Sequence, residues 1–454
     1  MKYITVLLFL SLLITTSTFA QSLEEKIGQM LMVGMPNNHD AKDTLLVDIS
    51  ERHLGGVILF GYNLDSPDQI RSLTTELQQN ADTRLLISVD QEGGIVARLN
   101  ENNGYSETYS AEELGMEFNS EDSTRAMAQM MSHWLKDAGF TMNLAPVTDL
   151  RVNAQSPAIG FLNRSFSDDP QTVVEHASWF IDEFHQNNIA TTLKHFPGHG
   201  SAEQDSHFGF TDISETWQDI ELEPFANLIN NGYNDPIMTG HLFKSDWDSE
   251  HPVSLSDYAV RTILRDSLGF DGVVISDELF MRALTNNYSL DETVIRTINA
   301  GTDLLLFNTN MREDHSLVQY LINLIFENVQ NGVISEATIS RSYDRIMKLK
   351  EERIPTSTEQ ITDQSTTPNR FEIRNYPNPF NPTTNITVSL LSPEEASITV
   401  YNVAGQRVQT IHVGQLSRGV HTFRFDGSSL SSGVYYVVAR TGQQLQTHPM
   451  MLLK

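Results

Sequence analysis

The sequence predicts an α/β protein, a TIM-type (β/α)8 barrel followed by a small antiparallel β-sandwich. From residue 21 to 353, short apolar runs rich in β-branched residues alternate with longer amphipathic stretches. The short runs are continuously apolar, which indicates strands of a parallel sheet that is buried on both faces. After residue 370 the apolar residues recur with a period of two, as in antiparallel strands with one buried face.

The first twenty residues are typical of a signal peptide. Lys2 precedes an apolar run over 4–14, and Thr18, Phe19 and Ala20 offer a cleavage site of small residues before Gln21. A membrane anchor is the alternative, but the run is too short to span a bilayer comfortably. We therefore expect a secreted or cell-surface protein that passes through the periplasm and has no transmembrane span.

Eight apolar runs are the candidate strands of the barrel. They cover residues 30–33, 56–60, 85–89, 142–145, 190–193, 236–239, 272–275 and 303–306. Helix-like stretches, such as 123–138 and 170–186, lie between them. About eight strand–helix units in a row predict a closed barrel. An open, doubly wound sheet is the alternative, but no Gly-rich phosphate-binding loop follows the first strand.

The composition changes near residue 354. Residues 354–370 are rich in Thr, Ser, Gln and Pro, which indicates a flexible linker. Period-2 runs then follow at 386–390, 397–401, 422–425 and 434–438, separated by turn residues. The predicted organisation is a signal peptide (1–20), a barrel (21–353), a linker (354–370) and a β-sandwich (371–454).

Charge and cysteine content exclude several classes of function. The chain of 454 residues has a formal net charge of −28, so nucleic acid and anionic membranes are not expected partners. It contains no cysteine, which excludes disulfides, thiolate metal sites and cysteine nucleophiles.

Polar side chains follow five of the predicted strands. These residues are Asp90, Asp149, Lys194 with His195, His241 and Asp277. In a (β/α)8 barrel the carboxyl ends of the strands form one face, and active sites assemble there. The pattern therefore predicts a functional site on that face.

The densest group of reactive side chains lies at 194–207. The segment begins with KHFPGHG (194–200), whose glycines and proline indicate a loop, and ends with Asp205, Ser206 and His207. Acid/base catalysis by His207 fits best, because histidine titrates near neutral pH and Asp205 can fix its tautomer and raise its pKa.

Two other interpretations of this segment remain. A metal site would use His195, His199, His207 and Asp205, but their irregular spacing lacks helical i, i+4 geometry. The histidines can also be capping and surface residues without a chemical role. We expect no metal and no cofactor.

A carboxylate also ends the predicted strand 272–275. Asp277 can attack an anomeric carbon and form a glycosyl-enzyme, the usual route of a retaining glycosidase. A carboxylate at this position can instead cap the next helix, a role that suits Glu278 better than Asp277.

Two further segments hold candidate sugar ligands. In the first, Gly93 and Gly94 allow the backbone to approach a ligand, while Asp90 can accept and Arg98 can donate hydrogen bonds. A turn with a surface ion pair explains this segment equally well. In the second, Arg164 is a two-pronged donor, although a plain surface arginine is as good an interpretation.

At these motifs the chain resembles glycoside hydrolase family 3, specifically its single-domain β-N-acetylglucosaminidases. The likeness covers about residues 27–350; KHFPGHG is close to a family signature, and 205–207 fits the family's mobile loop. The resemblance implies a retaining exo-glycosidase with Asp277 as nucleophile and the His207–Asp205 pair as acid/base. It also implies that the sugar is held by Asp90, Arg98, Arg164, Lys194 and His195.

The resemblance implies that terminal β-linked N-acetylglucosamine is removed from chitin oligosaccharides or peptidoglycan fragments. The chain departs from the family at Gln91, Glu278 and 201–202, none of which is assigned a chemical step. A histidine in place of an acid/base carboxylate removes a negative charge, so phosphorolysis is an alternative to hydrolysis. A β-glucosidase specificity and a non-catalytic sugar-binding surface protein are further alternatives.

The C-terminal segment resembles the type A sorting domain of the type IX secretion system. The residues that carry the likeness are YPNPFNP (376–382), SGVYY (432–436) and the final LLK (452–454). The resemblance implies export by the type IX secretion machinery. A carbohydrate-binding module is the alternative, but Tyr435 and Tyr436 are strand neighbours that point to opposite faces and form no stacking platform.

Overall fold

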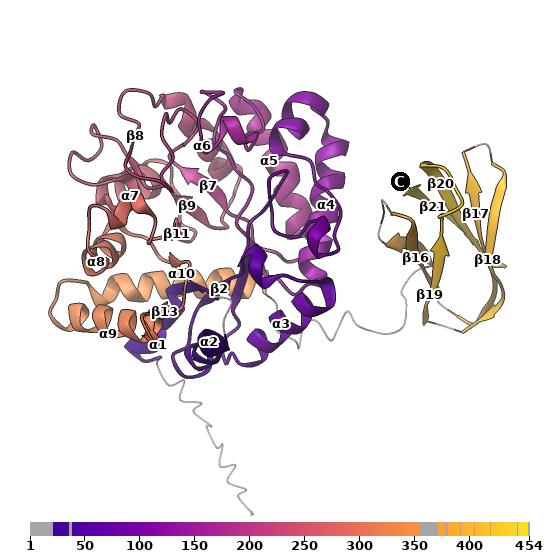
Figure 1. Cartoon of the computed structure of the whole chain (residues 1–454), viewed down its shortest axis with the longest axis horizontal. Coiled ribbons are helices and arrows are strands. Elements are labelled where there is room, and N and C mark those ends of the chain that lie inside the picture. Colours follow the sequence, from indigo (N-terminus) through magenta and orange to yellow (C-terminus); the bar gives the residue numbers. More distant parts are fainter. Residues whose placement is uncertain are drawn as a thin grey trace, which may run out of the picture. The chain divides into compact units, whose positions relative to one another are not determined.

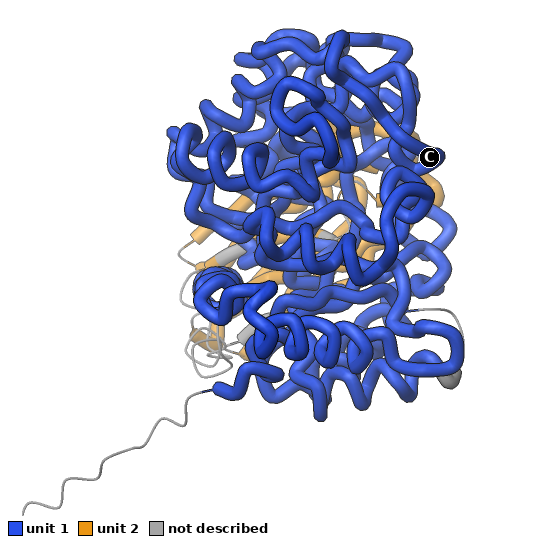
Figure 2. The backbone as a smooth tube through the Cα atoms, turned by 90° about the vertical axis from the view of Figure 1, so that its left-hand side faces the viewer, with its two compact units in different colours: residues 1–354 blue, residues 355–454 orange. Residues whose placement is uncertain are grey.

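The chain forms two compact units that divide between Ile354 and Pro355 (Figure 2). The computed structural model describes residues 21–35, 39–354, 371–376, 378, 380–390, 392–403, 405–417, 419–442 and 444–452. The predicted signal peptide at 1–20 and all but the first residue of the predicted linker at 354–370 lie outside these residues.

The core of the first unit is a set of parallel strands. They are β1 (Leu31–Gly34), β2 (Gly56–Ile58), β3 (Leu86–Val89), β6 (Met142–Asn143), β7 (Leu193–Phe196), β9 (Ile237–Thr239), β11 (Val274–Ser276) and β12 (Leu305–Phe307). They form two sheets, in the orders β12-β1-β2-β3-β6 and β11-β9-β7, with every neighbouring pair parallel. Isolated parallel bridges, Met142 to Ala190 and Ile275 to Leu304, link the two sheets on both sides. All residues of these strands are buried, which explains why the runs are continuously apolar.

Helices alternate with the strands and lie around them in Figure 1. The α-helices are α1 (Leu23–Gln29), α2 (His39–Glu51), α3 (Pro67–Gln79), α4 (Glu121–Asp137), α5 (Pro170–His185), α6 (Glu223–Asn230), α7 (Arg282–Thr285), α8 (Leu290–Ala300), α9 (Leu317–Gln330) and α10 (Glu336–Arg353). Two π-helices are η3 (Glu113–Phe118) and η7 (Tyr258–Ser267). Capping side chains accept a backbone N–H at the start of several helices: Ser22, Ser66, Asp169, Ser289 and Ser316.

The loops contain short helical turns and strand pairs. The turns are η1 (Gly61–Asn63), η2 (Glu101–Asn103), η4 (Gly160–Leu162), η5 (Asp219–Leu222) and η6 (Val253–Leu255). The short strands are β4 (Gln91–Gly93), β5 (Val96–Ala97), β8 (Thr211–Asp212), β10 (Leu242–Phe243), β13 (Met311–Arg312) and β14 (His315–Ser316). β8 and β10 pair in parallel, so the segment after β7 is tied to the segment after β9.

One predicted strand is displaced. The apolar run 190–193 predicts a strand, but β7 begins at Leu193 and continues through Lys194 and His195 to Phe196. The strand extends into polar sequence because Lys194 and His195 are 2 % and 6 % exposed and are buried together with carboxylate partners. These two residues therefore lie inside the strand and not after it.

The second unit consists of two antiparallel sheets. One has the order β15 (Glu372–Tyr376), β16 (Thr383–Leu390), β19 (Gly419–Asp426). The other has the order β18 (Arg407–Leu416), β17 (Glu394–Asn402), β20 (Gly433–Arg440), β21 (Leu445–Leu452). Side chains from both sheets form one apolar cluster, in which Ile386, Val400 and Val437 are fully buried. Tyr435 is 8 % exposed and Tyr436 38 %, as expected for strand neighbours on opposite faces.

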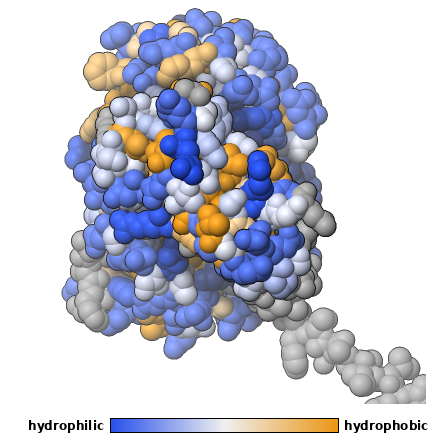
Figure 3. Space-filling view, turned by 90° about the vertical axis from the view of Figure 1, so that its right-hand side faces the viewer, coloured by the Kyte–Doolittle hydropathy of each residue, from blue (hydrophilic) through white to orange (hydrophobic). Residues whose placement is uncertain are grey.

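On the face drawn in Figure 3, hydrophilic residues cover most of the coloured area, and hydrophobic residues lie in groups among them. No helix in the described part of the chain combines the length and apolar character needed to cross a membrane.

Candidate active site

The carboxyl ends of the parallel strands bring the predicted polar residues to one edge. Asp90 directly follows β3, and Asp277 directly follows β11. Lys194 and His195 lie in β7, and His241 comes two residues after β9. Because the strands are parallel, these residues share the face at which active sites of such folds assemble.

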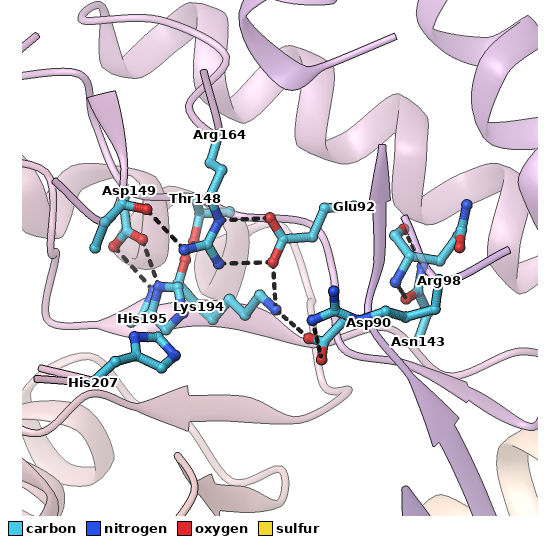
Figure 4. Close-up of polar contacts among 12 residues, drawn as sticks. Asp90, Glu92, Arg98, Asn143, Thr148, Asp149, Arg164, Lys194, His195 and His207 are labelled. Atoms are coloured by element: carbon cyan, nitrogen blue, oxygen red, sulfur yellow. Dashed lines mark hydrogen bonds and ion pairs between the residues drawn. The ribbon is translucent and has the colours of Figure 1, made fainter. Parts of the chain in front are cut away.

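Lys194 belongs to a network of four charged side chains, which Asp90, Glu92 and Arg164 complete (Figure 4). Lys194 Nζ lies 2.8 Å from Asp90 Oδ1 and 2.7 Å from Glu92 Oε1. Arg164 donates from Nε and Nη2 to the two oxygens of Glu92, each at 2.8 Å, and from Nη1 to the carbonyl of Ala158. Glu92 therefore links Arg164 to Lys194, which in turn contacts Asp90. No sequence pattern had singled out Glu92.

The network keeps its members charged. Burial acts to raise the pKa of Glu92, but Arg164 and Lys194 outweigh it and hold that pKa well below its usual range. Burial acts to lower the pKa of Lys194, but Asp90 and Glu92 raise it above its ordinary value. Ionised groups held rigidly at a low-dielectric site are strong hydrogen-bond partners for ligand hydroxyls.

Arg98 joins this group at its edge. Its Nη2 lies 3.6 Å from Asp90 Oδ2, and its side chain is 34 % exposed, against 18 % for Asp90. The buried Nε of Arg98 has no hydrogen-bond partner. The structure thus contains the ion pair between Arg98 and Asp90 that the alternative interpretation of this segment predicts.

The paired glycines before Arg98 serve the chain's own packing. Gly93 has φ +105°, and a Cβ there would lie 2.3 Å from the carbonyl oxygen of Tyr109. Gly94 has φ +57°, and a Cβ there would lie 2.7 Å from the Cβ of Ser110. Contacts within the chain therefore account for both glycines, for which the sequence had suggested close approach of the backbone to a ligand.

His195 is held by a buried aspartate. Asp149 Oδ2 lies 2.7 Å from His195 Nδ1, and Asp149 Oδ1 accepts the backbone N–H groups of His195 and His199 at 2.9 and 2.8 Å. Burial acts to raise the pKa of Asp149, but the charge of His195 and its hydrogen bond lower it. The ionised carboxylate fixes the proton of His195 on Nδ1, so Nε2 is the atom left for a ligand.

The imidazole ring of His199 is uncharged at neutral pH. Burial lowers its pKa to about 4, helped by the charge of His195. A ring that is neutral at neutral pH and 2 % exposed fits a structural role.

Asp205 and His207 form a pair on the loop after β7. His207 Nδ1 lies 2.7 Å from Asp205 Oδ1, and the backbone N–H of His207 donates to the same oxygen at 2.9 Å. The hydrogen bond to Asp205, assisted by the negative charge of Asp277, raises the pKa of His207. Burial acts to raise the pKa of Asp205, but the bonds from His207 lower it to about 2. The side chain of His207 is 57 % exposed, so a ligand can reach it.

Asp277 interacts with three histidines. Burial acts to raise its pKa, but the charges of His241, His195 and His207 together lower it. Asp277 Oδ1 also accepts the backbone N–H of Glu278 at 2.8 Å. The residue is therefore ionised at neutral pH and lies within electrostatic range of His207.

His241 and Glu278 support this position. His241 is bound on both nitrogens, by Ser254 Oγ at 2.7 Å and the carbonyl of Glu278 at 2.9 Å. Glu278 Oε1 accepts the backbone N–H groups of Phe280 and Asn308. Neither belongs to α7, so Glu278 does not cap the next helix. Burial and the charge of Asp277 raise the pKa of Glu278 to about 7.

Three residues of the suggested metal site have partners of their own. His195 is bound by Asp149, and Asp205 and His207 bind each other. In the part of the chain that the structure describes, no three histidine, aspartate or glutamate side chains are grouped in a way that could hold a metal ion.

Comparison with known proteins identifies the family. Residues 22–349 match the model described as Glycosyl hydrolase family 3 N terminal domain, and residues 374–452 match that of the Secretion system C-terminal sorting domain. A beta-hexosaminidase of Tolumonas auensis is 36 % identical over 279 residues, which are 58 % of this chain and 80 % of the relative. That of Haemophilus influenzae is 35 % identical over 308 residues, 65 % of this chain and 84 % of the relative.

Solved structures agree with this assignment. A glycoside hydrolase family 3 beta-N-acetylglucosaminidase from Paenibacillus sp. has a TM-score of 0.68 at 34 % identity; the match covers 74 % of this chain but only 63 % of that one. The beta-N-acetylhexosaminidase of Beutenbergia cavernae has a TM-score of 0.67 at 27 % identity, over 73 % of this chain and 99 % of that one. The chain belongs to glycosyl hydrolase family 3 and is a glycoside hydrolase.

Proposed function

We propose that the protein is a retaining exo-β-N-acetylglucosaminidase, with Asp277 as nucleophile and His207 as acid/base. The observation that carries the proposal is that an ionised Asp277 and a histidine with a raised pKa, His207, lie within electrostatic range of each other. The similarity to two beta-hexosaminidases, a beta-N-acetylglucosaminidase and a beta-N-acetylhexosaminidase supports the sugar specificity.

The reaction proceeds in two displacements. A carboxylate oxygen of Asp277 attacks the anomeric carbon while protonated His207 gives its Nε2 proton to the departing glycosidic oxygen. The glycosyl–Asp277 ester is then hydrolysed by a water, whose proton neutral His207 accepts. Asp205 holds the imidazolium form of His207 through Nδ1 and keeps Nε2 directed to the reacting oxygen.

The charged network holds the sugar during these steps. Asp90, Arg164 and Lys194 take hydroxyl groups, and His195 offers the nitrogen that Asp149 does not use. Arg98, whose side chain is 34 % exposed beside Asp90, adds a guanidinium donor at the edge of the network. The carboxylates and cations are already desolvated and fixed, so little reorganisation accompanies substrate binding.

Phosphorolysis of the same bond is the second candidate. Neutral His207 carries no negative charge, in contrast to the carboxylate acid/base that most glycosidases use. An anionic phosphate acceptor therefore meets less repulsion from the acid/base side chain itself than it would from a carboxylate. Dependence of turnover on phosphate distinguishes the two reactions.

We also infer that the first unit is a closed barrel, that the second unit is a β-sandwich, and that the type IX machinery exports the protein. The two parallel sheets and the bridges between them support one closed (β/α)8-type barrel, and the two antiparallel sheets with a shared apolar cluster support a β-sandwich. The sorting-domain match at 374–452 supports secretion by the type IX machinery, after the predicted signal peptide has directed the chain to the periplasm.

The test compares aryl β-N-acetylglucosaminide with aryl β-glucoside, with and without phosphate. We expect the wild type to cleave the first and not the second, and Asp277→Ala to abolish turnover. Azide should restore activity to Asp277→Ala by taking the place of the missing nucleophile. A variant with the wild-type rate would refute the assignment of Asp277, and preference for the glucoside would refute the sugar specificity.

A further inference from the structure

The residues that follow His207 must lie near the leaving group if His207 is the acid. Proton transfer requires a distance of about 2.6–3.2 Å between its Nε2 and the glycosidic oxygen. The leaving group is therefore bound beside His207. It lies on the side of the anomeric carbon that is opposite to Asp277. The chain continues there as Phe208, Gly209 and Phe210.

Both phenylalanines are exposed. The exposed fraction is 73 % for Phe208 and 48 % for Phe210. Exposed aromatic rings that gather beside a reactive group, rather than singly on a surface, are typical of binding sites. A pyranose presents an apolar face of C–H groups that stacks on such rings.

One backbone hydrogen bond and one ring contact position this segment. The backbone N–H of Phe208 donates to the carbonyl of Asp205 at 3.0 Å, in the same turn that forms the His207 pair. The ring of Phe210 packs on that of Phe243, with 5.0 Å between the ring centroids. Strands β8 and β10, which follow Phe210 and contain Phe243, are paired. A platform held in this way loses little conformational freedom when a ligand binds.

The chain segment that contains this platform, residues 195–246, is rich in acidic residues. Between Lys194 and Lys244 the sequence has no lysine or arginine. Lys244 itself is 7 % exposed, lies 3.4 Å from Asp246, and is stacked on the ring of Trp217. Exposed acidic residues of the same region are Glu203, Asp212, Glu215 and Asp246. Such a region repels an anionic leaving group and accepts a neutral one.

We propose that Phe208 and Phe210 form the binding site for a neutral pyranose leaving group, so that N-acetylated chitin oligosaccharides are preferred over fragments ending in the carboxylate of muramic acid. The proposal rests on the role of His207 given under the proposed function. It adds the substrate class that the site selects.

The first experiment compares N,N′-diacetylchitobiose with methyl β-N-acetylglucosaminide. Both leaving groups are alkoxides that need protonation, but only the first has a ring that can stack. For Phe208→Ala, the ratio of kcat/KM between the disaccharide and the methyl glycoside should fall about fivefold to tenfold, the range expected for one aromatic contact. Phe208→Trp should restore the ratio, and Phe210→Ala should lower it.

Tyr258→Ala is the matched control. Tyr258 is 44 % exposed on η7, an element outside the loop that follows β7, so its removal should leave the wild-type ratio. An unchanged ratio in both Phe208→Ala and Phe210→Ala overturns this inference alone. Failure of the wild type to cleave even the methyl glycoside overturns the proposed function and this inference with it.

The second experiment tests the charge preference. Wild-type kcat/KM for diacetylchitobiose should exceed that for N-acetylglucosaminyl-β-1,4-anhydro-N-acetylmuramic acid severalfold at low ionic strength. The difference should narrow at 0.5 M NaCl, as salt screens the acidic groups. Equal rates for the two disaccharides at low salt would contradict the selection of a neutral leaving group.

Discussion

Replacing Glu92 by glutamine removes the one charge that links Arg164 and Lys194. Glu92 is 8 % exposed, accepts two hydrogen bonds of 2.8 Å from Arg164 and lies 2.7 Å from Lys194 Nζ. The glutamine keeps one acceptor oxygen, but its amide group points N–H bonds at a buried cation. Lys194 then keeps Asp90 as its close carboxylate partner, whereas Arg164 keeps only its bond to the carbonyl of Ala158.

The magnitude follows from the burial of these groups. Breaking a buried ion pair by neutralising one partner costs about 3–5 kcal/mol, because the other charge stays buried without compensation. A bond to a charged group contributes about 1.5–3 kcal/mol, and the remaining oxygen of glutamine retains one of them. We therefore expect Glu92→Gln to lower the free energy of unfolding by about 3 kcal/mol at pH 7.

Urea unfolding followed by tryptophan fluorescence measures this change. The four tryptophans all precede residue 354, so the signal reports on the first unit within the intact chain. Glu292→Gln is the matched control, because Glu292 and Arg296 form a pair at 2.8 Å in which each side chain is 41 % exposed. Its loss should cost less than about 0.5 kcal/mol. The reasoning is refuted if the two variants unfold at the same urea concentration.

Three further predictions concern pH and leaving groups. His207→Ala should slow glycosides with poor leaving groups far more than aryl glycosides with good ones, because only the former need protonation; equal losses would count against His207 as the acid. The hydrogen bond to Asp205 raises the pKa of His207 above 6.5, so Asp205→Asn should shift the basic limb of the kcat/KM profile to lower pH, and a limb that stays in place would contradict the pairing. Burial lowers the pKa of Lys350 from 10.5 to about 7, so the unfolded chain binds more protons between these values, and stability should rise with pH across that window. Denaturant unfolding at pH 7 and 9.5 should show this rise in the wild type and lose it in Lys350→Met.

The sequence predicted the polar residues of the site better than their partners. The bond between Asp205 and His207 joins residues two positions apart, so local spacing was enough to predict it. The partners of Lys194 and His195 lie far away in sequence, at Glu92 and Asp149. These pairs depend on which strand ends are neighbours in space, and no local pattern contains that information.

The same limit applies to the strands. The sequence located the interior strands of the first unit to within a few residues, since burial on both faces leaves a continuous apolar run. In the second unit it missed Glu372–Tyr376, Arg407–Leu416 and Leu445–Leu452, which are all edge strands of their sheets. Along β18 and β21 most side chains are at least partly exposed, so the period-2 pattern of apolar residues is weak. Pro449 in β21 adds a residue that is tolerated at a sheet edge.

Trapping the covalent intermediate tests the central assignment most directly. A 5-fluoro N-acetylglucosaminyl fluoride should form the glycosyl-enzyme faster than water hydrolyses it, and peptide mass spectrometry then locates the added sugar. We predict one sugar per chain, attached to Asp277. A sugar on any other residue, or turnover of this reagent with inversion at the anomeric carbon, would contradict the nucleophilic role of Asp277.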